Sequence, residues 1–279
     1  MLNGLATRVA DHVETLSDVL HFATHGSQGR RREIARDFLK MRFLLGVAKK
    51  NQKPPDHLSL LGIPIHFSDL GTFKYVFEEV FIHECYGGCP ITPATILDCG
   101  SNIGMSIVYF KSLWPHARIT GVEASPGTFA LLQENVAGLK DVRILNKAVS
   151  DREGSIPFYT SPGLGVSSTN PLRGASEEVL VEAMPLSRLI EGEIDLLKID
   201  IEGSEIAAFE ELEASGKMPL IRFMFIEYHH HLPGESHALS TFLSRLERCG
   251  FNYETAAALP KRVGNFQDIV IRAWQAQPH

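Results

Sequence analysis

Two glycines four residues apart follow an acid at the end of an apolar run, and this combination could hold a small ligand. The run ends at Asp98, Gly100 and Gly104 come next, and a helix-like segment begins at Met105. The order predicts a strand, a tight turn and a helix. Glycine lets a backbone approach a ligand closely, and the N–H groups at a helix start are free to face it. We therefore expect a ligand over this turn; a turn that only joins strand to helix is the alternative.

The residues around the glycines indicate which ligand this is. A dinucleotide fingerprint reads Gly-x-Gly-x-x-Gly, whereas this chain has Asn102 in place of the second glycine. A carboxylate as close as Asp98 repels a pyrophosphate and attracts a cation. S-adenosylmethionine carries a sulfonium and an ammonium group but no phosphate. We therefore predict this cofactor at five residues, namely Asp98, Gly100, Ser101, Asn102 and Gly104.

A second acid lies about 20 residues beyond the turn, where related folds place a carboxylate that binds a ribose. Glu123 ends the apolar segment 117–122, and Ala124, Ser125 and Pro126 follow it. Ser125 is a good N-cap and Pro126 suits the first helical position, so a sharp strand-to-helix junction is expected. We predict that Glu123 and Ala124 contact the cofactor, with Glu123 accepting hydrogen bonds from the ribose hydroxyls. A solvated charge at the strand end is the alternative for Glu123.

These motifs and three later ones resemble those of the FkbM-type S-adenosylmethionine-dependent methyltransferases. The resemblance covers roughly residues 77–251, and its most specific motif is Asp-Leu-Leu-Lys-Ile-Asp-Ile-Glu-Gly-Ser-Glu at 195–205. The other segments that carry it are 96–104, 122–126, 134–136 and 146–151. The resemblance implies a class I methyltransferase fold. That is a Rossmann-like α/β fold with a doubly wound, mostly parallel seven-stranded sheet and an antiparallel hairpin at the C-terminal end.

The periodicity of the chain supports the same fold class. Strands and helices alternate from residue 94 onward, which calls for a doubly wound parallel sheet, and segments 251–257 and 266–274 are expected to pair antiparallel. Ligands of such sheets lie at the carboxyl ends of the strands. Asn146 and Ala148, which follow a strand at 142–145, are therefore predicted to lie beside the adenine, with a plain loop as the alternative. We assign the glycine-rich loop 163–170 to substrate contacts.

Charged residues gather at the ends of two further strands. Lys198 and Asp200 share one face of the strand 195–200, and Glu227 follows the strand 220–225. Lysine is seldom buried without a partner, so we interpret Lys198 as part of an ion pair that orders the site, in preference to a direct catalytic role. Asp200 is also expected to touch the cofactor. Acids at the positions of Asp200 and Glu227 hold magnesium in catechol-type methyltransferases, but the resemblance does not require a metal, and the sequence leaves Mg²⁺ open.

Methyl transfer to an alcohol requires removal of the hydroxyl proton. Histidine titrates near working pH, so His229 is the predicted base, with His230 and His231 as alternates. The expected function is an O-methyltransferase that acts on a hydroxyl of a small molecule, such as a sugar or secondary metabolite. Two alternatives stay open: methylation of a carboxylate or nitrogen of a small molecule or peptide, and a non-catalytic adaptor with the same fold.

The composition indicates which partners the protein binds and in which compartment we expect it. The net charge is −6, with 44% hydrophobic and 22% charged residues, which is typical of a soluble globular chain and argues against a general nucleic-acid binder. The chain begins without a basic start followed by an apolar core, and no later apolar run is long enough to cross a bilayer. We therefore expect a cytoplasmic protein without stable membrane insertion.

The N-terminal part falls outside the resemblance. Apolar residues recur at helical spacing from Leu5 to Leu20, a basic helix is expected over 30–50, and 51–56 has the composition of a linker. We divide the chain into a helical extension, residues 1–55, and a methyltransferase domain, residues 56–279. The extension is expected to form a lid over the substrate or the surface of a homodimer, and the sequence does not separate these roles.

Overall fold

The computed structural model describes residues 17, 19–26, 29–51, 55–160, 167–168, 177–231, 239–257 and 266–275. Most of the predicted substrate loop 163–170 and residues 1–16 of the first predicted helix lie outside these residues. None of the helices within the described ranges combines the length and the apolar character that a bilayer crossing requires.

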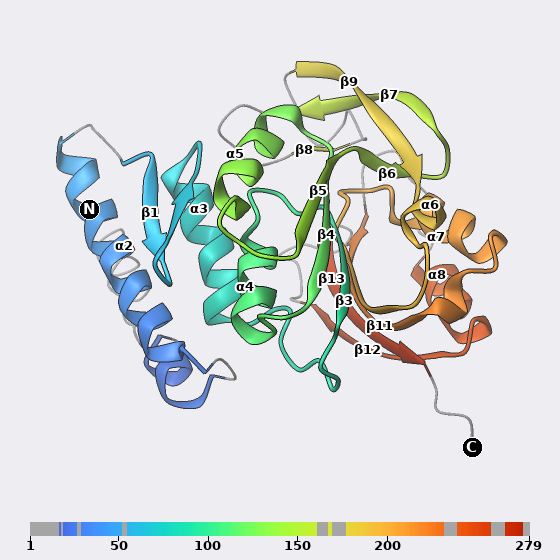
Figure 1. The fold of residues 1–279 in the computed structure, drawn as a ribbon, viewed down its shortest axis with the longest axis horizontal. Helices are drawn as coiled ribbons and strands as arrows, with labels where there is room; N and C mark the ends of the chain where they lie inside the picture. Colours follow the sequence, from blue (N-terminus) through green and yellow to red (C-terminus); the bar gives the residue numbers. More distant parts are fainter. Residues whose placement is uncertain are drawn as a thin grey trace.

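A seven-stranded sheet runs through the centre of the molecule, in the order β12-β13-β11-β10-β3-β4-β5 (Figure 1). Its strands are β3 (Thr95–Cys99), β4 (Arg118–Glu123), β5 (Val142–Asn146), β10 (Ile194–Ile199), β11 (Ile221–His230), β12 (Phe251–Ala257) and β13 (Gln267–Gln275). The strands from β11 to β5 pair in parallel, while β13 pairs antiparallel with both β11 and β12. The predicted mostly parallel sheet with an antiparallel C-terminal hairpin is confirmed.

Helices cover both faces of this sheet, as Figure 1 shows. One face carries α3 (Leu70–Phe77), the π-helix η1 (Glu78–Ile82), α4 (Met105–Leu113) and α5 (Pro126–Val136). The other carries α6 (Leu186–Leu189), α7 (Glu205–Ala214), η3 (Met218–Leu220) and α8 (Leu239–Arg248). Side chains of β10 alternate between the two cores: Leu196 lies in the first, and Leu197 and Ile199 in the second. This alternation leaves Lys198 on the first face, as predicted.

A second, four-stranded sheet lies beside the first. It contains β6 (Ala148–Ser150), β7 (Gly154–Thr160), β8 (Ser167–Ser168) and β9 (Glu177–Pro185), in the order β6-β9-β7-β8. The residue pattern of segments 155–160 and 178–182 predicts two of these strands, but not the separate sheet. Its small core, which includes Ala148 and Phe158, lies next to the end of β4, where Ala124 packs against it.

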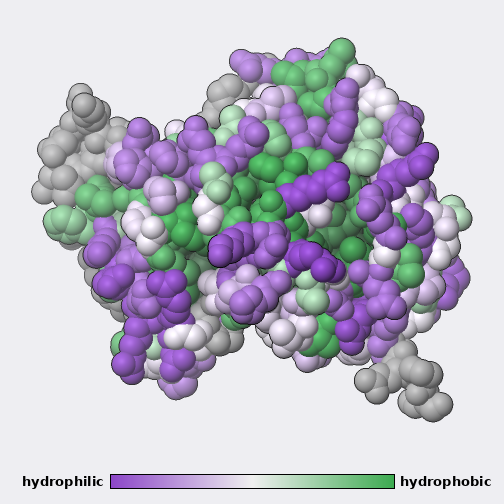
Figure 2. Space-filling model, in the orientation of Figure 1, coloured by the Kyte–Doolittle hydropathy of each residue, from purple (hydrophilic) through white to green (hydrophobic). Residues whose placement is uncertain are grey.

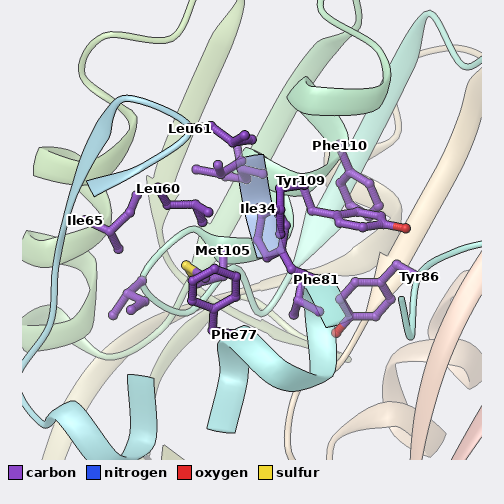
Figure 3. Close-up of a cluster of buried hydrophobic side chains, with 14 of the residues drawn as sticks. Ile34, Leu60, Leu61, Ile65, Phe77, Phe81, Tyr86, Met105, Tyr109 and Phe110 are labelled. Carbon is purple, nitrogen blue, oxygen red and sulfur yellow. The ribbon is translucent and has the colours of Figure 1, made fainter. Parts of the chain in front are cut away.

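The N-terminal elements pack on the main core. They are α2 (Arg31–Asn51), which was expected over 30–50, and an antiparallel pair, β1 (His57–Leu60) and β2 (Ile63–His66), which the residue pattern of 58–60 and 63–67 predicts. Ile34 of α2 belongs to the same buried cluster as Phe77 and Tyr109 (Figure 3). Figure 1 shows α3 between α2 and the rest of the molecule. The division at residue 55 stays a prediction, although part of the extension shares its core with the sheet.

The surface is mixed in character on the face that Figure 2 shows. Hydrophilic residues cover most of it, and hydrophobic surface shows in the middle, over the region where Figure 1 draws β4 and β5. β5 is the last strand of the sheet, and its apolar side chains Val142, Ile144 and Leu145 are half-buried. The open edge of the sheet therefore contributes to this apolar surface.

Candidate active site

The strand, turn and helix predicted around the two glycines are present as β3, residues 100–104 and α4. Gly100 and Gly104 both have left-handed backbones, with φ of +81° and +94°. A Cβ at Gly100 would lie 1.7 Å from the carbonyl oxygen of Asp200, and one at Gly104 would lie 2.9 Å from Leu132 of α5. Both glycines are therefore required by close packing within the protein: Gly100 lets the ends of β3 and β10 meet.

The N–H groups of the turn are all engaged inside the protein. The first two, of Gly100 and Ser101, donate to the carbonyl oxygen of Val122, each at 2.9 Å, and the third, of Asn102, donates to Oε2 of Glu123 at 2.9 Å. The last two, of residues 103 and 104, donate to oxygens within the turn. The predicted donors at the helix start, the N–H groups of residues 105–107, are separate from these and stay a prediction. Because the N–H groups of residues 100–104 all have acceptors within the protein, the turn itself does not offer them to a ligand.

A pocket, here called the Glu123 pocket, lies at the carboxyl ends of β3, β4 and β10. Six of the residues predicted to bind the cofactor line it: Gly100, Asn102, Glu123, Ala124, Ala148 and Asp200. Its walls also include Val122, Val149 and Phe158, which provide apolar surface of the kind that a purine ring packs on, and Thr128, Lys147, Ile201 and Glu202. Phe158 comes from the second sheet, which sequence reasoning did not connect with the site.

The other four predicted cofactor residues are absent from the described lining of this pocket. Asp98 is fully buried, and its Oδ2 accepts a hydrogen bond of 2.6 Å from the Ser106 hydroxyl. Ser101 donates from Oγ to the Asp98 carbonyl oxygen, and Gly104 packs against α5. The Asn146 amide donates to the carbonyl oxygens of Glu123 and Ala124, at 2.8 and 3.0 Å. These contacts give the four residues supporting positions. Their direct contact with the cofactor stays a prediction that the burial of Asp98 does not favour.

Glu123 is held in place by its own backbone surroundings. Its Oε1 accepts from the N–H of Ser125 at 2.8 Å, and its Oε2 from that of Asn102. Burial raises the pKa of Glu123 to about 7, although these two N–H groups act in the opposite direction. The predicted cap is confirmed, since α5 begins at Pro126 and Ser125 accepts from the N–H of Thr128. The side chain thus faces the pocket with each oxygen bonded once and further lone pairs available.

Lys198 is a buried cation next to the glycine turn. Its Nζ lies 2.6 Å from the carbonyl oxygen of Gly100, 3.3 Å from Asp200 Oδ2 and 3.5 Å from Asp98 Oδ1. It also lies 5.6 Å from the centre of the Tyr86 ring. Burial alone would lower the pKa of Lys198, but the attraction of Asp200 and Asp98 outweighs it and raises the pKa. This geometry is that of the ordering ion pair that the sequence suggested.

A second cavity, here called the Glu227 cavity, adjoins the Glu123 pocket. The two share Gly100, Asn102, Asp200 and Glu202, which we call the shared wall. Carboxyl groups dominate the lining: Glu79 from η1, Asp200 and Glu202 after β10, Glu227 from β11 and Asp268 from β13. The two cations are Lys198 and His229, and the remaining polar lining includes Thr72, Tyr75 and Tyr86. The site therefore pairs a pocket lined by three carboxyl groups and Lys147 with a cavity lined by five carboxyl groups.

His229 connects the cavity to the start of α7. Its Nδ1 lies 2.8 Å from Oε1 of the buried Glu205, and its Nε2 lies 3.2 Å from Glu202 Oε2 and 3.8 Å from Asp200 Oδ1. Burial alone would lower the pKa of His229, but Glu205 and Asp200 raise it to about 9. An imidazolium cannot accept a proton, so this charge state disfavours the predicted role as general base. The alternates His230 and His231 contact each other and are absent from the described lining of the cavity.

Glu79, Glu202 and Asp268 are site residues that the sequence analysis missed. Glu79 lies on a π-helix, a form of helix that occurs often at functional sites. Burial, with the charges of Asp200 and Asp268, raises the pKa of Glu79 to about 7. Glu202 has a left-handed backbone, with φ of 57°. A signal was available only for Glu202, which lies inside the most specific motif, because α3, η1 and β13 carry no pattern that places them at the site.

The known proteins to which this chain is similar include several that are named as methyltransferases. The family model described as the methyltransferase FkbM domain matches residues 98–253. The chain is 28% identical over 193 residues to methyltransferase sdnD of Sordaria araneosa, which is 55% of this chain and 74% of the relative. It is 30% identical over 155 residues to 2-O-methyltransferase NoeI of Sinorhizobium fredii, 48% of this chain and 62% of the relative. A solved methyltransferase FkbM of Methylobacillus flagellatus aligns with 87% of this chain and 60% of its own, at 14% identity and a TM-score of 0.45.

Proposed function

The chain belongs to the FkbM methyltransferase domain family, and from this premise we propose that it is an O-methyltransferase acting on a hydroxyl of a small molecule, such as a sugar or secondary metabolite. The observation that carries the proposal is the shared wall, which brings the Glu123 pocket and the Glu227 cavity into contact at Gly100 and Asp200. Two ligands in these sites would meet at that wall, as a direct transfer between them requires. The oxygen acceptor is supported by a relative that is named as a 2-O-methyltransferase.

The Glu123 pocket fits S-adenosylmethionine by its chemistry. Glu123 offers carboxylate oxygens to the two ribose hydroxyls, and Val149 and Phe158 offer apolar surface to the adenine. Asp200, which lies in the shared wall, offers negative charge to the cationic end. When bound, the cofactor supplies a methyl group on a sulfonium. The residues of the pocket bind and orient it and do not take part in bond making.

Methyl transfer from the sulfonium to a hydroxyl oxygen releases one proton, so it requires one proton acceptor. The acceptor oxygen forms a bond to the methyl carbon while the carbon–sulfur bond breaks, so the sulfonium becomes a neutral thioether. The hydroxyl proton must leave, and we propose the Glu79 carboxylate as the group that takes it. Glu79 lines the Glu227 cavity, and a carboxyl group whose pKa is about 7 suits a base near neutral pH. Glu227 and Asp200 would orient the acceptor by accepting hydrogen bonds from other polar hydrogens of the same molecule.

The charge of the Glu227 cavity bears on which acceptor group it can bind, a carboxylate, an amine or a hydroxyl. Five carboxyl groups line it, which would repel an acceptor that is itself a carboxylate. An amine acceptor suits the same charge, so N-methylation is the second candidate function. A hydroxyl needs a base and an uncharged amine does not, and this difference allows a test.

The test begins with calorimetric titration of S-adenosylhomocysteine against the purified protein, with NAD as the control ligand. Labelled S-adenosylmethionine is then offered with panels of hydroxyl, amine and carboxylate acceptors, and products are identified by mass spectrometry. We expect an oxygen-methylated product and a fall in kcat of about 10²-fold or more in Glu79→Gln. Glu78→Gln is the matched control, because Glu78 pairs with Arg42 and Lys74. Turnover of amines alone, unaffected by Glu79→Gln, would establish the second candidate instead.

A further inference from the structure

Three side chains at the ends of adjacent strands meet in the Glu227 cavity in a way that the methyl-transfer scheme does not explain. Asp200, Glu227 and His229 each offer one ligand atom, and the three atoms lie within 4.8 Å of one another. Asp200 follows β10, and the other two belong to β11, the neighbouring parallel strand. The register of the sheet pairs Ile199 with Ile226, and Asp200 and Glu227 directly follow these two residues. All three line the same cavity.

The orientation of His229 is a second and independent observation. Its Nδ1 is bonded to Glu205, whose carboxylate also accepts from the N–H groups of Ile201 and Gly203 at 3.3 and 3.1 Å. Glu205 is itself 2% exposed, so the ring cannot turn. A carboxylate on one ring nitrogen that directs the other nitrogen into a site is the usual outer arrangement of a histidine that ligates a metal. Here Nε2 is the nitrogen directed at the cavity.

The surroundings of Nε2 also call for positive charge. It lies 3.2 Å from Glu202 Oε2, and 3.8 Å from both Asp200 Oδ1 and Asp268 Oδ1, and the last two distances are too long for hydrogen bonds. The hydrogen bonds among the described residues provide Glu227 with no donor. Ligand atoms around an octahedral divalent ion lie about 3 Å apart when adjacent and about 4 Å when opposite. The three atoms therefore need to close by up to about 2 Å to hold one ion.

We propose that Asp200, Glu227 and His229 bind a divalent cation, and that the ion presents the acceptor hydroxyl to the cofactor. Two carboxylates and an imidazole form a mixed oxygen and nitrogen set, which suits Mn²⁺ or another first-row ion better than Mg²⁺, whose preference is for oxygen alone. Three protein ligands leave positions for the acceptor oxygen, and a bound hydroxyl loses its proton more readily. The role in methyl transfer rests on the proposed function, whereas binding of the ion does not.

Titration of the metal-free full chain with Mn²⁺, followed by electron paramagnetic resonance, tests the site without any turnover. We expect one bound ion and nitrogen coupling from the imidazole in pulsed spectra. Glu227→Gln is expected to weaken Mn²⁺ binding by about tenfold or more, and His229→Asn to remove the nitrogen coupling. Glu79→Gln, the same change in the same cavity outside the ligand set, is expected to alter affinity by less than about threefold. Titration with S-adenosylhomocysteine checks that each variant is folded.

Three results would overturn the inference. They are no Mn²⁺ binding below about 1 mM, equal losses in Glu227→Gln and Glu79→Gln, and binding without nitrogen coupling. Equal losses would mean that the cavity attracts cations only through its overall charge. Methyl transfer that continues at full rate in the metal-free protein would remove the role of the ion and leave the proposed function in place. Failure of S-adenosylhomocysteine to bind the wild-type chain would instead count against the proposed function.

Discussion

The Glu123 pocket and the Glu227 cavity share a wall but are built in different ways. The pocket is built mainly from short segments at the ends of β3, β4, β5 and β10, with Phe158 added from β7, and backbone N–H groups hold Glu123. The cavity brings together α3, η1, β10, β11 and β13, and side-chain charge dominates it. A fold that binds one constant ligand and one variable ligand can keep the first kind of site and change the second. The comparison predicts that damage to the wall harms both sites, whereas damage elsewhere stays local.

Removal of the buried cation under the wall is expected to have the largest effect. Lys198→Met leaves Asp98 buried without its ion-pair partner, which should lower the free energy of unfolding by about 3–5 kcal/mol and weaken both sites. Urea unfolding followed by circular dichroism measures the change. Lys111→Met is the matched control, because within the described residues the buried Lys111 donates to the backbone carbonyl oxygens of Pro115 and Ala117, and its loss should cost about 1–3 kcal/mol. Equal losses in the two variants would contradict the ion-pair interpretation.

The second largest effect is expected from a methyl group added to the shared wall. Gly100→Ala forces a left-handed alanine against the Asp200 carbonyl oxygen and should lower the free energy of unfolding by about 3 kcal/mol. Binding of both S-adenosylhomocysteine and Mn²⁺ should fall, because Gly100 lines both sites. Gly127→Ala provides the control, since a Cβ at Gly127 meets nothing within 4 Å. Loss of only one of the two ligands would show that the sites are less connected than we infer.

A change confined to the pocket should leave the cavity intact. Glu123→Ala removes the acceptor proposed for the ribose hydroxyls and should weaken S-adenosylhomocysteine binding by about 1–3 kcal/mol. Mn²⁺ affinity should stay within about twofold, since Glu123 lines the pocket and is absent from the described lining of the cavity. Calorimetry measures the first and spin resonance the second. Unchanged S-adenosylhomocysteine affinity would remove the ribose assignment.

The same acid should make cofactor affinity depend on pH. Because burial raises the pKa of Glu123 to about 7, the carboxylate predominates only above that pH, and roughly a tenth of it remains at pH 6. If the ribose hydroxyls bind the ionised form, affinity for S-adenosylhomocysteine should fall by up to about tenfold from pH 8 to pH 6. Glu123→Gln should abolish the dependence, and a slope that persists in this variant would assign it to another group.

The contrast between the two sites also explains what the sequence could predict. Gly100, Glu123 and Lys198 belong to strand ends with a local pattern, so their positions followed from the order of strands and helices, which the structure confirms. Glu79 and Asp268 come from elements far from these motifs, and only packing brings them to the cavity. Burial and neighbouring charge set the charge state of His229, and neither can be read from three consecutive histidines. The internal bonding of the turn was missed because Val122 and Glu123, which accept its N–H groups, lie about 20 residues away.

The completed hydrogen bonds of residues 100–104 have a consequence for how a ligand arrives. A turn whose N–H groups already have acceptors has no ordering to undergo, so little conformational entropy is lost there on binding. This part of the Glu123 pocket is therefore rigid before the ligand binds. The rate of ligand association there depends on diffusion and on electrostatic steering, and not on a rearrangement of the turn. Discrimination between ligands there depends on shape that exists beforehand.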